Sequence, residues 1–365
     1  MMTVYECIVI GAGPGGLAAS FYLQQNGVRY LTLEKGGIGQ SWKNMSACFD
    51  LITPMWTNAL PGDRCCVRPF KHITCNQYGE YLEHYAARAN LHIQCHTNVH
   101  HVDTEAELLR VHTDTGVFTT QTLISAAGYF SNPYQPDIEI DAHPGSLVLH
   151  AADYRSIEQL RKHKVQSLLI VGKRNTAGQL LADLHRAGLR VALSIRNPLT
   201  FRDNSSLKGV VKEFLYYFWE VGLILRDPHR RQNSFPPMDS RDAKAIIDSG
   251  TIEFFPNVQR ISGKTVTFAD QSSSSFDAVI FATGYRPELR HLAVLGQQTA
   301  QVSDQTVAHL EQQHIFLLGI DNLYNFRSRY IRGIRQDARV VVHKVQQALT
   351  TFTVGKPATL CAPPQ

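Results

Sequence analysis

Ile8–Ala19, IVIGAGPGGLAA, decides the fold: an apolar strand enters a glycine-rich turn, and a helix begins directly after it. Gly11 permits the tight turn, Gly13 lets the backbone approach a pyrophosphate, and Gly16 lets the helix pack closely against its strand. The phosphates would meet the positive N-terminal end of that helix. Two residues at the helix start share this expected contact: Pro14 and Gly15. The pattern is typical of a dinucleotide-binding unit.

A carboxylate completes this unit. Glu34 follows the apolar run at residues 30–33 and lies 23 positions after Gly11, where it can hold both ribose hydroxyls of an adenosine. A lone glycine triplet would be a weak signal, but strand, turn, helix, second strand and terminal carboxylate together are specific. We therefore expect an α/β domain that binds a dinucleotide.

Length and composition leave room for a second unit. The chain has 365 residues, 44% of them hydrophobic and 18% charged, as in an ordinary globular protein with two or three domains. No run of about 18 apolar residues predicts a membrane span, and the N-terminal apolar stretch is expected to be a strand, not a signal peptide. Seven cysteines without framework spacing fit reduced thiols in a cytoplasmic enzyme. A net charge of +5 without a basic block does not indicate a nucleic-acid partner.

Residues 166–180 repeat the pattern of strand, glycine turn and helix, with Gly172 as the first glycine. The next apolar strand ends at Arg196, at the place where the first unit has Glu34. No carboxylate is available there to bind a free 2′-hydroxyl, whereas an arginine can pair with a 2′-phosphate. The second unit is therefore expected to prefer NADPH over NADH.

Arg174 occupies the place of the middle glycine in the second turn, so a side chain begins where the backbone should approach the pyrophosphate. Three interpretations stay open. The guanidinium contacts phosphate, or the site binds NADPH poorly, or it binds no nicotinamide nucleotide at all.

Several further segments resemble the flavin-containing monooxygenase family and its bacterial relatives. Residues 36–42 (GGIGQSW), 51–62, 125–136 and 281–285 (FATGY) resemble motifs of that family. Residues 125–136 resemble its hinge from the flavin domain into the NADPH domain, and residues 281–285 resemble the return crossing. The resemblance covers nearly the whole chain and implies FAD and NADPH as cofactors.

The glycine turns and the resemblance together imply the cofactor contacts. In the FAD unit they are Gly11, Gly13, Pro14, Gly15, Gly16, Glu34, Lys35, Gln40, Ser41, Trp42, Thr53, Ala127, Gly128 and Asp337. In the NADPH unit and at the return crossing they are Gly172, Lys173, Arg174, Asn175, Thr176, Arg196, Thr283 and Gly284.

Asn58 is the candidate catalytic residue. In the segment 56–58 (WTN) it matches the asparagine that lies over the flavin in this family. The resemblance therefore implies a side-chain amide that hydrogen-bonds the nicotinamide, the substrate or the oxygenated flavin. The alternative is a turn asparagine before residues 60–62 (LPG), because asparagine is common in turns.

His150 begins a stretch, 150–155, that resembles the second half of the family's identifying motif. The first half departs from it, since Ser146 and Pro144 stand where a glycine and a phenylalanine are expected. A satisfied polar residue at a strand end explains His150 at least as well as a catalytic role does.

Two clusters suggest other chemistry and have simpler explanations. No two cysteines have the spacing of a disulfide reductase, and the ring of a Cys65–Cys66 disulfide would be strained. Histidines crowd near residues 92–101, but apolar and polar residues alternate from 91 to 100, which predicts one half-buried strand with histidines on its polar face. No metal site is therefore expected.

The most apolar stretch is residues 214–225, FLYYFWEVGLIL. With 12 residues and an internal glutamate it is too short to cross a bilayer, and we expect a buried or capping helix in an insertion of the second unit. Its aromatic side chains would wall a substrate pocket, form a homodimer contact, or pack in the core.

Arginines cluster around Gly333 near the C-terminus: Arg327, Arg329, Arg332 and Arg335. By resemblance, this glycine and the following helix start face the flavin ring, where a positive helix end would stabilise the reduced flavin. The arginines would contact an anionic substrate or a phosphopantetheine carrier, or lie solvated on the surface.

Together these patterns predict two Rossmann-like α/β domains, with an NADPH domain at 158–275 inserted in a discontinuous FAD domain at 1–157 and 276–365. The resemblance implies a monooxygenase that uses FAD, NADPH and molecular oxygen to oxygenate a small nitrogen-, sulfur- or carbonyl-containing substrate through a C4a-peroxyflavin. Two alternatives stay open. One is a flavin oxidase or dehydrogenase that needs no nicotinamide nucleotide, and the other is a nucleotide-bound regulatory or scaffold flavoprotein.

Overall fold

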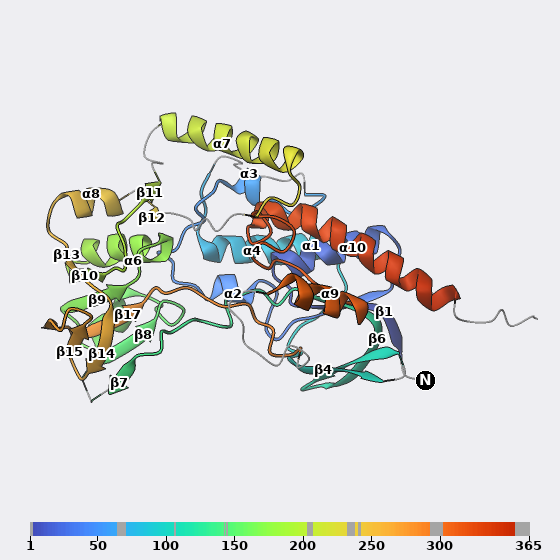
Figure 1. The fold of residues 1–365 in the computed structure, drawn as a ribbon, viewed down its shortest axis with the longest axis horizontal. Coiled ribbons are helices and arrows are strands. Elements are labelled where there is room, and N and C mark those ends of the chain that lie inside the picture. The colour runs from blue at the N-terminus through green and yellow to red at the C-terminus, as the bar shows by residue number, and fades with distance from the viewer. Residues whose placement is uncertain are drawn as a thin grey trace, which may run out of the picture.

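The computed structural model describes residues 3–63, 71–105, 107–141, 143, 145–202, 207–231, 238–239, 242–292 and 302–354. These residues form two α/β units that lie side by side and are joined by two chain crossings (Figure 1). The expected pair of Rossmann-like domains is thereby confirmed. Two features of the sequence analysis, the Cys65–Cys66 pair and Pro144, lie outside the described residues.

The first unit is built around β1 (Val4–Ile10), which pairs in parallel with β2 (Tyr30–Leu33) on one side and β6 (Gly116–Ser125) on the other. Its strand order is β3-β2-β1-β6-β5-β4, and β18 also pairs with β6. The bounds of these outer strands are Ile93–Gln94 for β3, Val99–Glu105 for β4, Leu108–Thr113 for β5 and Ile315–Leu317 for β18. The first glycine turn lies at the carboxyl end of β1, which is where open α/β sheets bind ligands.

The helices of the first unit cover this sheet. α1 (Pro14–Gln25) begins at its proline, which suits the first helical position because no N–H is needed there. α1 packs against α10 (Ile331–Val354), whose buried Val341 and Val345 belong to the same core. The other helices are α2 (Gln40–Lys43), α3 (Met55–Asn58), α4 (Cys75–Arg88) and α9 (Asp304–Gln312).

The second unit repeats the strand, turn and helix in β9 (Ser167–Val171) and α6 (Asn175–Arg186). Its parallel sheet has the order β13-β10-β9-β17-β8. The other strands of this sheet are β8 (Leu147–His150), β10 (Arg190–Ser194), β13 (Glu253–Phe255) and β17 (Ala278–Phe281). The remaining helices are α5 (Ile157–Lys162), α7 (Leu207–Arg226) and α8 (Ala243–Asp248).

A smaller sheet, β16-β15-β14-β7, shares a hydrophobic core with this parallel sheet. Its strands are β7 (Glu139–Asp141), β14 (Val258–Ser262), β15 (Thr265–Phe268) and β16 (Ser273–Ser275). A separate short parallel pair consists of β11 (Phe201–Arg202) and β12 (Met238–Asp239).

The domain boundaries differ from the expected ones. β8 and β17 pair with each other inside the second sheet, so the chain leaves the first unit after β6 and returns after β17. The crossings therefore lie at 126–136 and 282–292, and not at 157/158 and 275/276. The expected boundaries left β8 and β17 in the FAD domain, although both strands belong to the sheet of β9.

The expected strand at 91–100 is wrong. The chain forms β3 and β4 there, separated by a bend in which His96 has a φ of +53°. Polar and apolar residues alternate through this bend as they would in a strand, so alternation could not distinguish the two. Among the described residues, no group of three or more His, Cys, Asp or Glu side chains is arranged to hold a metal ion.

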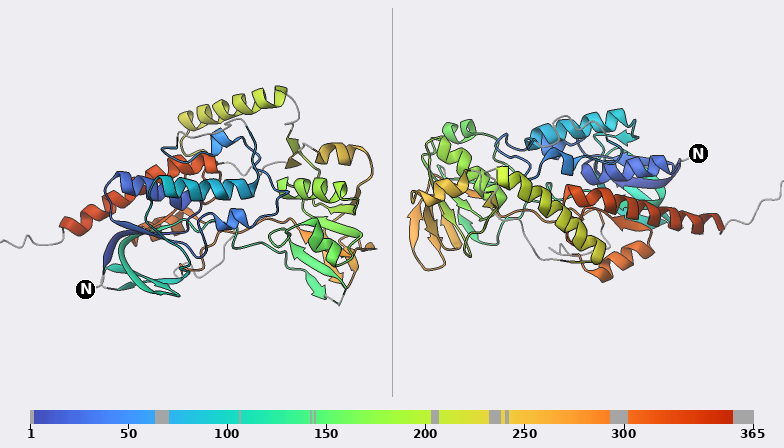
Figure 2. Two further views of the ribbon diagram at one scale, coloured as in Figure 1. Left: turned by 180° about the vertical axis from the view of Figure 1, so that it is seen from behind. Right: turned by 90° about the horizontal axis from the view of Figure 1, so that it is seen from above.

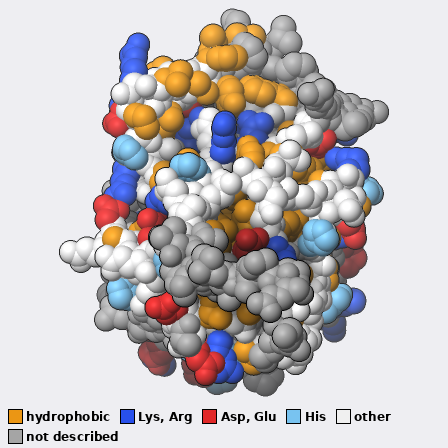
Figure 3. Space-filling view, turned by 90° about the vertical axis from the view of Figure 1, so that its right-hand side faces the viewer, with side chains coloured by type: hydrophobic (Ala, Val, Ile, Leu, Met, Phe, Trp, Pro, Cys, Tyr) orange, Lys and Arg blue, Asp and Glu red, His pale blue; other side chains and the backbone are white. Residues whose placement is uncertain are grey.

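The apolar stretch at 214–225 lies in α7, which runs over α3 and the start of α10 and so caps the first unit (Figures 1 and 2). The expectation that its side chains pack in the core is wrong for the outer face of α7, where Leu215, Phe218 and Trp219 are 61%, 53% and 53% exposed. Hydrophobic side chains gather at the height of α7 in the surface view (Figure 3). A homodimer contact on this face stays a prediction. No helix within the described ranges is long and apolar enough to span a bilayer.

Candidate active site

A cavity of about 1050 Å³ lies between the two units and is lined by both glycine turns, both crossings and the start of α10. Most of the expected cofactor residues line it: Gly11, Gly13, Pro14, Gly15, Glu34, Lys35, Gln40, Ser41, Trp42, Ala127, Gly128, Gly172, Lys173, Arg174, Asn175, Thr176, Arg196, Thr283 and Gly284. Others, all within the described part of the chain, do not: Gly16, Thr53, Asn58 and Asp337. The structure thus brings together residues from six separate stretches of sequence.

The first glycine turn has the shape that a diphosphate needs. Gly11 has a φ of +98°, and a Cβ there would lie 2.7 Å from the carbonyl oxygen of Ala126. A Cβ on Gly16 would overlap the carbonyl oxygen of Gly11. At Gly13, by contrast, an added Cβ would meet no atom of the described residues within 4 Å, so this side of the turn opens into the cavity. The turn fits the close approach of a dinucleotide such as FAD.

Glu34 is fixed at the edge of the cavity by the backbone around it. The N–H of Ala12 donates to its Oε2 at 2.7 Å, and the N–H of Gly36 donates to its Oε1 at 3.0 Å. Each carboxylate oxygen has two acceptor positions. One position on each oxygen can therefore still accept from a ribose hydroxyl, as the sequence analysis expects.

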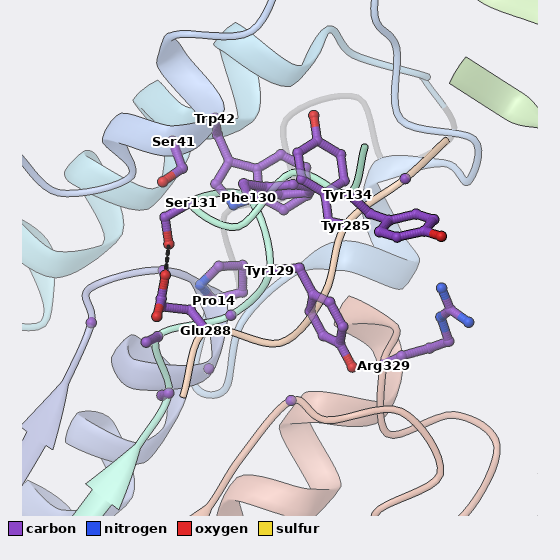
Figure 4. A pocket seen from close by; sticks show the side chains of 18 of the residues that line it. Pro14, Ser41, Trp42, Tyr129, Phe130, Ser131, Tyr134, Tyr285, Glu288 and Arg329 are labelled. Carbon is purple, nitrogen blue, oxygen red and sulfur yellow. Dashed lines mark hydrogen bonds between the residues drawn. The ribbon is translucent and has the colours of Figure 1, made fainter. Parts of the chain in front are cut away.

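The two crossings hydrogen-bond to each other. The N–H of Tyr134 donates to the carbonyl of Gly284 at 2.9 Å, and the N–H of Glu288 donates to that of Gly128 at 2.8 Å. The side chains of Ser131 and Glu288 also bond across the pair at 3.4 Å (Figure 4). The two crossings thus form one short hydrogen-bonded ribbon, which lines the cavity between the units.

Aromatic side chains gather on this ribbon and on α2. The Trp42 and Phe130 rings meet edge to face with centroids 5.0 Å apart, and Phe130 meets Tyr285 in the same way at 5.2 Å. Tyr134 lies beside them, and Arg329 enters the same space from the loop just before α10 (Figure 4). Except for Trp42, these rings were not expected at the site. Their signal was available, because Phe130 and Tyr134 stand inside the hinge segment.

The second glycine turn accommodates its arginine. Gly172 needs to be glycine, because a Cβ would lie 2.6 Å from the carbonyl oxygen of Ala282. Arg174 caps α6 with an extended backbone, φ −109° and ψ −167°, which any residue adopts. Partial desolvation, and then the charge of Arg329, lower the pKa of the Arg174 guanidinium. Arg174 thus lines the cavity within electrostatic reach of Arg329 of the first unit.

Further polar groups surround this second turn. Asn175 Oδ1, in the first turn of α6, is buried without a hydrogen-bond partner among the described residues. Arg196 is exposed at the cavity edge just after β10, and Lys173 lies nearby, with its Nζ 3.3 Å from the carbonyl of Pro198. An orphaned acceptor and three cations fit a phosphorylated dinucleotide.

Of the four C-terminal arginines, Arg335 is half-buried and the other three divide into two groups. Arg329 lines the cavity and pairs with Asp321 at 2.9 Å. Arg327 and Arg332 are buried, 2% and 9% exposed, and face Glu220 of α7. A solvated surface position is therefore wrong for these two. The sequence could not show this, because their carboxylate partner lies more than 100 positions away.

Asn58 does not reach the cavity. Its Nδ2 donates to the carbonyls of Thr53 and Pro54 at 3.0 and 3.1 Å, and the side chain is buried. Of the described residues that line the cavity, none comes from α3. These bonds fit the turn asparagine of the alternative interpretation, with Thr53 as its partner, and the catalytic role of Asn58 stays a prediction.

Asp337 lies inside α10, away from the cavity. Its Oδ2 is buried with no partner found among the described side chains, and burial raises the pKa of its carboxyl to about 6. Ser328 and Arg327 offset part of that rise. Asp337 is buried in α10 and does not line the cavity, so no contact with a cofactor in the cavity is seen.

His150 ends β8 with both ring nitrogens used. Nδ1 accepts from the N–H of Ala152 at 3.0 Å, so Nε2 carries the proton and donates to the carbonyl of Gly284 at 3.1 Å. Burial lowers its pKa. These bonds tie the strand end to the return crossing and match the structural interpretation.

His291 is a cavity residue that the sequence did not reveal. It is buried on the return crossing and its Nε2 lies 2.9 Å from Ser125 Oγ. Burial lowers its pKa to about 4, so the ring is neutral near pH 7. A single histidine outside any motif gives no sequence signal.

The described cysteines are poor nucleophiles. Burial raises the pKa of the Cys7, Cys48 and Cys75 thiols to about 12. Thiol–disulfide exchange needs the thiolate. These thiols therefore do not support disulfide reduction.

Comparisons with known proteins agree with this geometry. A family model described as pyridine nucleotide-disulphide oxidoreductase matches residues 8–319. An uncharacterized oxidoreductase, CzcO-like, of Geobacillus kaustophilus is 27% identical over 354 residues, which cover 94% of this chain and 99% of that protein. The probable indole-3-pyruvate monooxygenase YUCCA1 of Arabidopsis thaliana is 30% identical over 322 residues, which cover 78% of this chain and 77% of that protein.

Among solved structures, a flavin-containing monooxygenase from Stenotrophomonas maltophilia superposes with a TM-score of 0.75 at 22% identity. The superposition covers 95% of this chain and 99% of that chain. At this identity the likeness establishes the shared fold.

Proposed function

The chain belongs to the pyridine nucleotide-disulphide oxidoreductase family, among its flavin monooxygenases, and from this premise we propose that it uses NADPH and molecular oxygen to oxygenate a small organic substrate. The family membership makes it an FAD-dependent oxidoreductase and confirms the resemblance seen in the sequence. The observation that carries the proposal is the cavity lined at once by both glycine turns.

In this proposal the first turn and Glu34 hold FAD. The open side of Gly13 admits the diphosphate, and the N-terminus of α1 offsets its charge. The carboxylate of Glu34 accepts from the adenosine ribose. Bound FAD would supply the redox chemistry, taking electrons from NADPH and activating oxygen.

The second turn and its cations hold NADPH. Arg196 pairs with the 2′-phosphate, and Lys173 and Arg174 meet the diphosphate, which is the first of the three interpretations of Arg174. Asn175 Oδ1 accepts a donor of the nicotinamide or its ribose, and so gains the bond that it lacks among the described residues. The place of Arg174 supports this assignment, because it lines the cavity at the start of α6.

The substrate is proposed to carry an anionic group and an oxidisable carbonyl, nitrogen or sulfur. Arg329 lines the cavity and would bind the anion. Phe130, Tyr134 and Tyr285 would cover an apolar body and keep water away. The name of the Arabidopsis relative points the same way, since indole-3-pyruvate is an aromatic 2-oxo acid. We therefore favour an aromatic or branched 2-oxo acid.

Anaerobic mixing of the FAD-loaded protein with NADPH tests the proposal. Bleaching of the flavin absorbance, followed by oxygen uptake coupled to 2-oxo acid consumption, is the expected result. A flavin that NADPH does not reduce, but an organic substrate does, would favour the oxidase or dehydrogenase alternative. A protein that binds nucleotides and is reduced by neither would favour the scaffold alternative.

A further inference from the structure

α7 belongs to the second unit by its place in the chain but packs on the first. It lies between β10 and β13, which are paired neighbours in the second sheet. Its C-terminal half nevertheless runs beside the start of α10 (Figure 2). α7 and the residues that follow it, up to 231, are called the strap from here on.

A buried carboxylate fastens the strap. Glu220 is 1% exposed, and both its oxygens accept from Arg332, Oε2 from Nε at 2.7 Å and Oε1 from Nη2 at 2.5 Å. Arg327 Nε lies 3.8 Å from the same Oε2. Such a bidentate pair is directional as well as strong, because the guanidinium fork matches the carboxylate only in one plane.

Other contacts hold the strap along its length. The Tyr217 and Trp56 rings meet with centroids 4.7 Å apart. The N–H of Phe326 donates to the carbonyl of Arg230 at 2.9 Å, and Arg231 pairs with Asp304. All of these partners belong to the first unit. The strap therefore ties the two units together apart from the crossings.

The pair of Glu220 and Arg332 also contacts the wall of the cavity. Arg332 lies over the ring of Tyr330, with its guanidinium carbon 4.3 Å from the ring centroid, and Tyr330 lines the cavity. At Gly333 the first turn of α10 packs tightly against Arg327, because a Cβ there would overlap the carbonyl oxygen of Arg327. The stretch 327–334 therefore turns Arg327 and Arg332 to the strap, and Arg329, Tyr330 and Ile334 to the cavity.

We propose that Glu220 is a positioning residue, which fixes Tyr330 in the cavity wall by holding Arg332 and closes the strap of the second unit onto the first. The proposal rests on this cavity being the site of reaction. Removal of the carboxylate leaves two buried guanidinium groups facing each other with no shared counter-charge. The strap then opens, and Arg332 is no longer held over the ring of Tyr330.

Glu220→Gln, which keeps the size and removes the charge, tests the proposal. The matched control is Glu83→Gln, because Glu83 also forms an ion pair, with Lys43 at 2.5 Å, but is 55% exposed. The first measurement is trypsin cleavage of the strap at Arg226 and Arg230 in the full-length protein as purified. The expected result is cleavage roughly tenfold faster in Glu220→Gln and unchanged in the control, because proteolysis tracks the open form.

The second measurement is the visible absorbance of the FAD-loaded protein, which reports the surroundings of the flavin. The expected result is a changed band shape in Glu220→Gln and in Arg332→Lys. Arg332→Lys keeps the charge, and with it the fold, but loses the fork and the planar stacking on Tyr330. Strap cleavage and flavin bands equal to wild type in both variants would overturn the proposal. Failure of the wild type to use NADPH would count against the proposed function and leave the cleavage test valid.

Discussion

Replacing Gly13 by alanine should separate cofactor binding from folding. Gly13 has φ −84° and ψ −171°, which alanine adopts, and its Cβ would meet no described atom within 4 Å. Alanine is a poorer helix cap than glycine, but it also restricts the unfolded chain. Each effect is below about 1 kcal/mol and the two oppose each other. The free energy of unfolding of the apoprotein should therefore change by less than about 1 kcal/mol.

FAD binding should fall sharply in the same variant. The methyl group occupies the space through which the diphosphate reaches the N–H groups of the turn. Loss of two charge-assisted hydrogen bonds weakens binding by about 3 kcal/mol or more, which is more than about 100-fold in Kd. Gly16→Ala should instead lower the free energy of unfolding, because its Cβ would overlap the Gly11 carbonyl oxygen and destabilise the fold itself.

Urea unfolding of the apoprotein and fluorescence titration with FAD check both expectations. Gly222→Ala is the control, since it makes the same change in α7 where the described atoms also leave 4 Å of space. It should bind FAD as wild type does. A Gly13→Ala variant that binds FAD within about threefold of wild type would refute the reasoning, because the diphosphate would then not approach this turn.

Further predictions concern the second turn and α10. Arg196→Ala should weaken NADPH by about 1.5 to 3 kcal/mol more than NADH, and equal losses in a binding titration would contradict the 2′-phosphate assignment. Arg174→Gly should slow anaerobic flavin reduction by NADPH, whereas a faster reduction would mark the arginine as a steric obstacle. Burial raises the Asp337 pKa from 3.8 to about 6, so the unfolded chain ionises first and stability falls as the pH rises between those values. The loss in the free energy of unfolding reaches about 3 kcal/mol. Urea unfolding at pH 4 and pH 7 should show this difference in free energy in wild type but not in Asp337→Asn.

What the sequence predicted well was local. The strand, turn and helix around Gly11 and the carboxylate of Glu34 are set by neighbouring residues, and the structure has them as expected. The role of Asn58 came from resemblance, and the sequence did not show that its amide bonds within its own turn. The pairing of Glu220 with Arg332 was out of reach, because α7 looked like a buried apolar helix and nothing along the chain shows which helix face turns inward.

The paired crossings make the second unit a removable module. The carbonyl of Gly128 and the N–H of Glu288 lie 2.8 Å apart, so the whole segment between them leaves and re-enters the first unit at one point on its surface. In geometric terms, exchanging this segment for another nucleotide-binding module requires joining ends that already touch. The exchange would nevertheless remove Glu220, and the first unit would be left with Arg327 and Arg332 uncovered. Recombination at this point therefore succeeds only with a module that brings its own carboxylate to that place.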